Sequence, residues 1–303
     1  YLSCYQGGLQ VMDVADPANP VWLGGADTPG LAMDVKVAGD YAYVADDNIG
    51  GATGGLYLFD VRNPAQPVLA GSYVNRGRGM GVAVEGTHAY LADYDAGVFV
   101  IDVSVPTNPT FVSKYVLFNN LMSGIAAISN RVYVADNGSA VGGFHALDVS
   151  DPANLVALGH FETNTLPRGV SVAGHLAALA SWNSGVEIME LSDETHPTRS
   201  GWLTTSATAQ DIALVGDRAL VADGNEGLQV LDVSLPHRPV RLARYNHRPE
   251  QAAKDNMTIV GVATRGAYAY VTDAYNVDQG LSVVDVSDPA HPVAVGHCRR
   301  QRR

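Results

Sequence analysis

The stretch GLQVLDVSLPHRPV, residues 227–240, is one of three nearly identical stretches in this chain. GLQVMDVADPANPV begins at Gly8 and GLSVVDVSDPAHPV begins at Gly280. Each has a short apolar run, an acidic residue that closes the run, and a turn that contains proline. Repetition at a regular period is the sequence signature of a repeat architecture, so the repeat decides the fold.

The second to seventh repeats each contain four strand-like segments. The closing acidic residue recurs at Asp13, Asp60, Asp102, Asp148, Glu190, Asp232 and Asp285. The segments are rich in β-branched and aromatic residues, as in GVAV, HAYLAD, GVFVIDV and PTFVSKY of residues 81–115. The third segment is apolar at nearly every position, which predicts a strand covered on both faces. Four-stranded sheets that cover one another are typical of a β-propeller, with repeats of about 40–45 residues.

We therefore predict an all-β fold, a seven-bladed β-propeller of four-stranded antiparallel blades. The prediction places one domain over residues 1–298 and a basic tail over residues 299–303. The first repeat begins at YLSCYQ, which matches the second strand of the other repeats. We expect its blade to lack the innermost strand.

Two connections of each repeat are constant. The closing acid lies seven residues before the position of the later proline, as in Asp13 to Pro20. Asp and Ser side chains accept hydrogen bonds from backbone N–H groups two residues on, so we interpret the closing acids as turn caps. The turn between the first two strands carries glycine, or Ser129-Asn130 in the fourth repeat, which predicts positive φ there.

The other two connections vary in length. The connection between the second and third strands spans four residues from Asp93 to Gly97 and nine from Asp46 to Gly55. The connection between one repeat and the next is longest between Pro239 and Gly261. In an antiparallel blade these two connections emerge at the same edge, which we call the variable rim. Variable loops on a rigid scaffold usually carry binding.

The motifs GLQVMDV, GLQVLDV and GLSVVDV make the chain similar to LVIVD-repeat proteins over essentially its whole length. The resemblance implies a β-propeller, commonly in secreted or surface-exposed prokaryotic proteins. It implies no catalytic residues, because no general activity is established for such proteins. We therefore expect a secreted, periplasmic or cell-surface location.

Composition narrows the expected partners. The formal net charge of −12 argues against binding to nucleic-acid phosphates. No apolar run approaches the roughly 18 residues of a transmembrane helix, so we expect no membrane insertion. The sequence also lacks HExxH, CxxC, P-loop and EF-hand motifs. A protein or glycan partner at the variable rim is the preferred hypothesis.

Positions that break the repeat are the candidates for ligand binding. They lie in loops of the variable rim and at the starts of inner strands, near the mouth of the predicted central channel. The candidates are Arg76, Arg78, Met80, Arg168, Gln210, Trp182, Tyr94, Tyr275, Arg248 and Lys254. This mixture of basic, polar and aromatic side chains suits an anionic or sugar-like ligand.

An enzyme is the first alternative. Asp34, Asp211, Arg168 and His247 fall near the same predicted channel mouth and could perform acid–base chemistry. The activity would then be that of a hydrolase or a lyase. A purely structural repeat within a larger surface protein is the second alternative.

Acidic residues end most second strands, and we interpret them as structural caps. The alternative is a structural Ca²⁺ bound by Asp46, Asp47 and Asn48, or by Asp93 and Asp95. Hard cations take such oxygen ligands. No other cofactor is expected.

The two cysteines lie near opposite ends of the chain. If the ring closes, Cys4 and Cys298 fall in adjacent blades, so a disulfide between them is a candidate. Two buried thiols are the alternative, because the geometry decides whether the bond can form.

Overall fold

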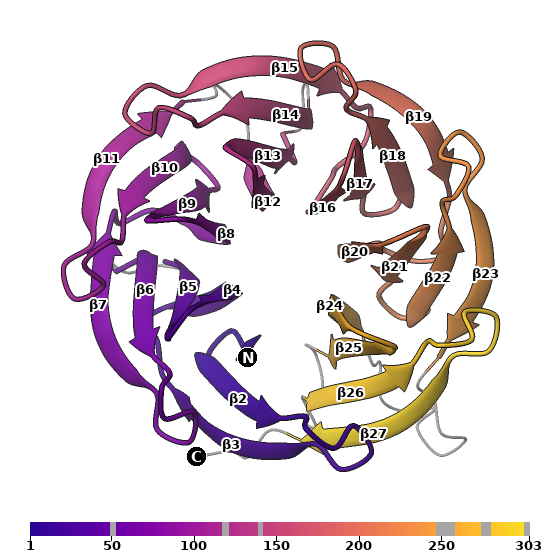
Figure 1. The fold of residues 1–303 in the computed structure, drawn as a ribbon, viewed down its shortest axis with the longest axis horizontal. Helices are drawn as coiled ribbons and strands as arrows, with labels where there is room; N and C mark the ends of the chain where they lie inside the picture. Colours follow the sequence, from indigo (N-terminus) through magenta and orange to yellow (C-terminus); the bar gives the residue numbers. More distant parts are fainter. Residues whose placement is uncertain (49–52, 117–120, 139–141, 247–257, 274–279, 300–303) are drawn as a thin grey trace. The chain divides into compact units, whose positions relative to one another are not determined.

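A computed structural model describes residues 1–48, 53–116, 121–138, 142–246, 258–273 and 280–299. All secondary-structure elements in these ranges are β-strands, and they form seven antiparallel sheets (Figure 1). No helix in the described ranges is long and apolar enough to cross a membrane. The predicted seven-bladed β-propeller is confirmed, and the first blade has three strands, as expected.

The strands follow the chain in the order of the blades. The first blade contains β1 (Leu2–Ser3), β2 (Leu9–Asp13) and β3 (Val21–Ala26). The second contains β4 (Leu31–Ala38), β5 (Tyr41–Asp47), β6 (Gly55–Asp60) and β7 (Val68–Val74). The third contains β8 (Gly79–Glu85), β9 (His88–Asp93), β10 (Gly97–Asp102) and β11 (Thr110–Tyr115). The fourth contains β12 (Met122–Ile128), β13 (Arg131–Asp136), β14 (Gly143–Asp148) and β15 (Val156–Glu162).

The last three blades repeat this order. The fifth contains β16 (Gly169–Ala173), β17 (Leu176–Ala180), β18 (Val186–Glu190) and β19 (Thr198–Leu203). The sixth contains β20 (Asp211–Val215), β21 (Arg218–Ala222), β22 (Leu228–Asp232) and β23 (Val240–Tyr245). The seventh contains β24 (Ile259–Arg265), β25 (Tyr268–Asp273), β26 (Gly280–Asp285) and β27 (Val293–Arg299).

Contacts group the blades into two compact units. The first unit is Tyr1–Met12, Leu23–Asn164 and Glu194–His196, which includes the second to fourth blades. The second unit is Asp13–Trp22, Thr165–Asp193 and Pro197–Arg303, which includes the sixth and seventh blades and most of the fifth. The single domain over residues 1–298 stays a prediction.

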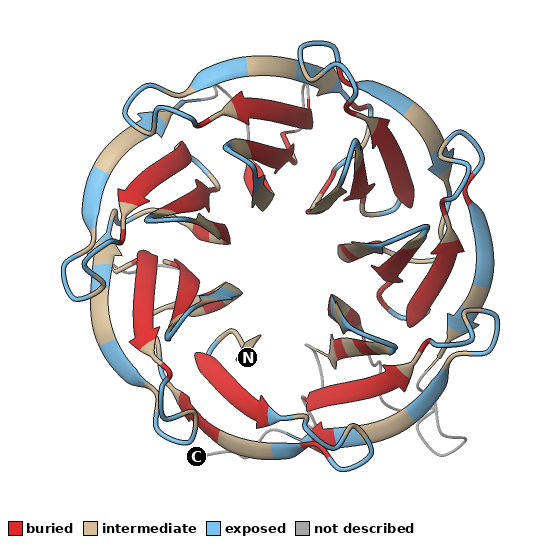
Figure 2. Ribbon diagram, in the orientation of Figure 1, coloured by how far each residue is buried: buried red, intermediate tan, exposed pale blue. Residues whose placement is uncertain are grey.

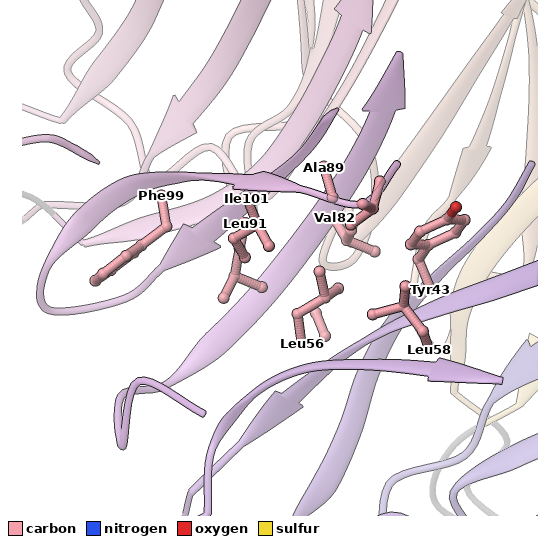
Figure 3. Close-up of a cluster of buried hydrophobic side chains, with 10 residues drawn as sticks. Tyr43, Leu56, Leu58, Val82, Ala89, Leu91, Phe99 and Ile101 are labelled. Carbon is pink, nitrogen blue, oxygen red and sulfur yellow. The ribbon is translucent and has the colours of Figure 1, made fainter. Parts of the chain in front are cut away.

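The middle strands form the core of each unit (Figure 2). Between the second and third blades, Leu56 and Leu58 of β6 pack in one cluster with Leu91 of β9 and Ile101 of β10 (Figure 3). Burying such a side chain contributes about 1.5–3 kcal/mol. All of Val98–Ile101 is buried, as the apolar run predicts.

The acid that closes each third strand caps the following turn. Oδ1 of Asp102 accepts the N–H of Ser104 at 2.8 Å. Hydrogen bonds from the Ser104 hydroxyl and from this N–H lower the pKa of Asp102. The same bond to the N–H two residues on is made by Asp13, Asp60, Asp148, Glu190, Asp232 and Asp285. The interpretation as turn caps is confirmed. The hairpin turn of the fourth blade also has the predicted positive φ, 53° at Ser129 and 61° at Asn130.

Candidate functional site

Buried acidic residues at the ends of second strands hold the segment that enters the same blade. Oδ2 of Asp93 accepts the N–H of Arg78 at 3.0 Å and the side-chain amide of Asn75 at 2.8 Å. Equivalent bonds to an entering backbone N–H are made by the buried Asp46, Asp136 and Asp223 and by the half-buried Asp273. Burial raises the pKa of Asp46, Asp93 and Asp223. These side chains therefore act as caps within the blade.

The two acids of the enzyme alternative connect neighbouring blades. In the first unit, Oδ2 of Asp34 accepts the N–H of Val82 in the next blade at 2.9 Å. In the second unit, Oδ2 of Asp211 accepts the N–H of Val262 at 2.9 Å. The other oxygen of each carboxylate accepts the N–H of the following residue at 2.8 Å. Both oxygens thus bind backbone, and burial raises the pKa of Asp34.

Arg78 and Tyr94 come together in the first unit. The guanidinium carbon of Arg78 lies 4.4 Å from the centroid of the Tyr94 ring. Its Nε and Nη2 donate to the two oxygens of Asp47 at 3.1 and 3.2 Å. A Ca²⁺ at Asp47 would have to displace this cation. Within the described ranges, no group of three or more His, Cys, Asp or Glu side chains could hold a metal ion, and the calcium site stays a prediction.

Arg168, Trp182 and Gln210 meet in the second unit, and we call them the Arg168 cluster. Arg168 precedes β16, Trp182 follows β17 and Gln210 precedes β20. The guanidinium carbon of Arg168 lies 3.7 Å from the centroid of the Trp182 ring, and its Nη1 donates to Oε1 of Gln210 at 3.3 Å. Nε2 of Gln210 donates to Thr208 at 3.2 Å. The three side chains of the cluster and that of Thr208 are half-buried, so they are partly accessible to solvent.

The backbone of Trp182 is strained. Its φ is 42°, in the left-handed region that bulky residues avoid, and paired hydrogen bonds with Ala209 hold it there. Gly224 takes the same place in the sixth blade, with φ 51° and the same pairing to Ile259. Tyr5 takes it in the first blade. A side chain in this conformation costs about 1–2 kcal/mol, so glycine is the less costly choice at Trp182.

Glu187 is a site residue that the sequence analysis missed. It is fully buried in β18, where it accepts hydrogen bonds from Ser181 at 3.0 Å and Thr165 at 2.5 Å. The guanidinium of Arg199 donates to its other oxygen at 3.1 Å. The network fixes the turn that carries Trp182, because Ser181 is the residue before it.

Comparison with the sixth blade explains Glu187. There the buried carboxylate is Asp223, which accepts from Gln229 at 3.2 Å. Ser181 stands at the register of Asp223, and Glu187 stands at the register of Gln229. The fifth blade has therefore exchanged the positions of its acid and its neutral partner. The signal in the sequence was two departures from the repeat, six residues apart.

Of the remaining candidates, Arg76 and Met80 lie in the described ranges and join neither group. Arg76 is exposed with φ 61°, and Met80 is half-buried in β8. His247, Arg248, Lys254 and Tyr275 lie outside the described residues. The structure contains no disulfide between the described Cys4 and Cys298, of which Cys4 is half-buried and Cys298 buried. The pairing stays a prediction.

Comparisons with known proteins agree on the fold. A family model described as "LVIVD repeat" matches residues 29–75, 76–116, 123–163, 207–247 and 260–299. No curated protein matches. The crystal structure of a protein from Lactobacillus plantarum is 16% identical with a TM-score of 0.80, over 99% of this chain and 98% of that one. The periplasmic gluconolactonase of Pseudomonas aeruginosa is 14% identical with a TM-score of 0.79, over 98% and 95%. Such likeness shows the fold alone.

The strain at Trp182 predicts that glycine destabilises the protein less than alanine does at this position, which is the reverse of the usual order within a strand. We expect Trp182→Gly to be more stable than Trp182→Ala by about 1 kcal/mol, because only glycine relieves the positive φ. Chemical denaturation measures the difference.

Trp202 supplies the matched control, because it lies within the regular strand β19. There we expect Trp202→Ala to be more stable than Trp202→Gly by about 0.5–1 kcal/mol. The same order at both positions would contradict strain at Trp182.

Because the acid and its neutral partner have exchanged positions in the fifth blade, we predict that substitutions at Ser181 and Glu187 have coupled effects on stability. Ser181→Asp brings a second carboxylate against Glu187, and Glu187→Gln removes the charged partner of Arg199. The double variant restores the pair found at Asp223 and Gln229. In a double-mutant cycle we expect a favourable coupling of about 0.5–3 kcal/mol. Additive destabilisation would show that the two positions do not substitute for each other.

Proposed function

The chain belongs to the LVIVD-repeat family, and from that premise we propose that it is a binding module for a carboxylate-bearing glycan. The ligand binds at the variable rim, with the Arg168 cluster as the binding site. We further propose a secreted, periplasmic or cell-surface location, where glycans of this kind are accessible. The observation that carries the proposal is Trp182, an aromatic residue kept at a strained position beneath Arg168.

The chemistry of the Arg168 cluster suits a carboxylate. A guanidinium presents its donors in one plane, and that fork matches both oxygens of a carboxylate. Stacking on Trp182 uses the face of the guanidinium rather than its N–H groups, and contributes about 0.5–2 kcal/mol. The stack and the bond to Gln210 therefore orient the donors before a ligand arrives. Such preorganisation lowers the entropic cost of binding.

The polar neighbours suit the rest of a sugar. The amide of Gln210 and the hydroxyl of Thr208 can each donate and accept, as sugar hydroxyl groups do. Arg78 in the first unit resembles Arg168, since it also stacks on an aromatic ring. Arg78 is not assigned to the proposed site, because its Nε and Nη2 donate to both oxygens of Asp47 within the first unit.

A hydrolase remains the alternative because of Asp34. Its pKa is raised by burial, as a general acid requires. The P. aeruginosa protein of the same fold is named as a gluconolactonase. Against this alternative, both oxygens of Asp34 accept backbone N–H groups. The same is true of Asp211.

We predict that the wild-type protein binds oligosaccharides of uronic acids and not their neutral counterparts. Trp182→Gly and Arg168→Ala should each weaken binding about tenfold or more, because a tenfold change corresponds to about 1.4 kcal/mol. Calorimetric titration against galacturonate, glucuronate and mannuronate oligomers measures this. Salt should weaken binding, since the contact is ionic.

Arg78→Ala is the matched control and should bind as the wild type does. Equal affinity for acidic and neutral oligosaccharides would contradict the proposal. So would unchanged binding by Trp182→Gly, or binding to no member of the panel. The last result would favour a protein partner.

For the hydrolase alternative, the measurement is hydrolysis of gluconolactone above the spontaneous rate. The binding proposal predicts none. Turnover that Asp34→Asn abolishes, while the exposed Asp217→Asn retains it, would overturn the binding proposal in favour of the enzyme.

A further inference from the structure

We infer that Trp202 forms a second subsite next to the Arg168 cluster, so that the ligand is an extended oligosaccharide and not a single sugar. The inference rests on the proposed function and specifies the kind of glycan. It depends on four features of the fifth blade: the exposure of Trp202, its anchoring, its polar surroundings and its departure from the repeat.

Trp202 is exposed and yet held in place. It lies in β19, and 57% of its surface is accessible. Its indole Nε1 donates to the carbonyl oxygen of Ser184 at 3.1 Å. The bond restricts the ring, so that an aromatic face is presented to solvent in a defined orientation. A ligand that stacks on this face need not immobilise a free side chain.

The two tryptophans are attached to one turn, residues 181–185. Trp182 is part of it, and Ser184, which binds the indole of Trp202, is two residues further on. Two residues span at most about 7 Å of chain. Buried Glu187 fixes the same turn through Ser181, and it also holds Arg199 of β19. Trp182 and Trp202 are therefore both held by one local hydrogen-bonded structure within the second unit.

The surroundings of Trp202 suit a glycan better than a protein. Asn183, which is exposed, and Ser184, which is half-buried, belong to the turn that binds the indole, and the exposed Arg199 and Thr204 lie in β19 or directly after it. Protein contacts are typically centred on aromatic anchors in well-packed apolar pockets, or marked by contiguous apolar patches. A single indole among amide, hydroxyl and guanidinium groups offers instead one apolar face with many hydrogen-bonding partners. A sugar ring has the same combination of C–H faces and hydroxyl groups.

Trp202 also breaks the repeat. Its cross-strand partner is Glu187, and the equivalent positions opposite the third strands of other blades are polar, basic or glycine. They are Gly25, Ser72, Lys114, His160, Arg244 and His297. The fold therefore does not require an indole here. Trp182 lies in the same blade, where it takes the place that glycine holds at Gly224 of the sixth blade.

The test is how affinity depends on the length of the oligouronate. We expect the wild-type protein to bind hexamers at least about tenfold more tightly than monomers or dimers. Trp202→Ala should bind hexamers no more tightly than dimers and keep the wild-type affinity for dimers. Trp182→Gly should bind both dimers and hexamers about tenfold or more weakly than the wild type does. Calorimetric titration gives the affinities, and circular dichroism with thermal melting confirms that each variant is folded.

Lys114→Ala is the matched control, because it removes the equivalent residue of the third blade. It should keep the dependence on length. Two results would overturn the inference while the proposed function stands: equal wild-type affinity for dimers and hexamers, or a loss in Trp202→Ala that is the same for both lengths. Unchanged binding by Trp182→Gly would instead overturn the proposed function, and this inference with it.

Discussion

The middle strands of each blade are covered on both faces, and this makes every blade depend on its neighbours. In the third blade, Ile101 packs towards the second blade, while Val98 and Val100 pack with Val132 and Val134 of the fourth. A single blade in water would expose both of these faces. Stacked repeats bury them, which is why apolar residues recur at the first, third and fourth positions of this run in every repeat.

The same constraint leaves the connections at one edge free to change. Carboxylates at the ends of second strands hold the entering segment, and turn caps at the opposite edge fix the constant loops. The fifth blade shows how much change this frame accepts. Its buried acid has moved from the register of Ser181 to that of Glu187, and Trp182 holds a backbone conformation better suited to glycine. Departures that cost stability and are not needed by the fold are the strongest indications of function in this chain.

The sequence was sufficient for the fold because its two main signals are local. The period of the closing acids and the apolar third strand indicated a propeller, and the cap at Asp102 needs only a partner two residues away. The roles of Asp34 and Asp211 could not be predicted, because the N–H groups they bind lie in the next blade. The channel-mouth grouping of these acids with Arg168 and His247 stays a prediction. Arg168, Trp182 and Gln210 could be predicted as ligand contacts because they depart from the repeat. Only the structure shows that the three side chains contact one another. Exposure and cross-strand register identified Trp202, and neither can be read from residue type.

The central claim is that the varied turn of the fifth blade, and not the repeated frame, binds the ligand. Grafting the sequence of residues 223–227 onto residues 181–185, together with Glu187→Gln, tests it most directly. The sixth blade already folds with this turn and with Gln229 beneath it. The decisive measurement is a calorimetric titration of the folded graft with a hexameric uronate that the wild-type protein binds. The account predicts an unfolding midpoint at or above that of the wild type and no detectable binding. Wild-type affinity in the folded graft would contradict it.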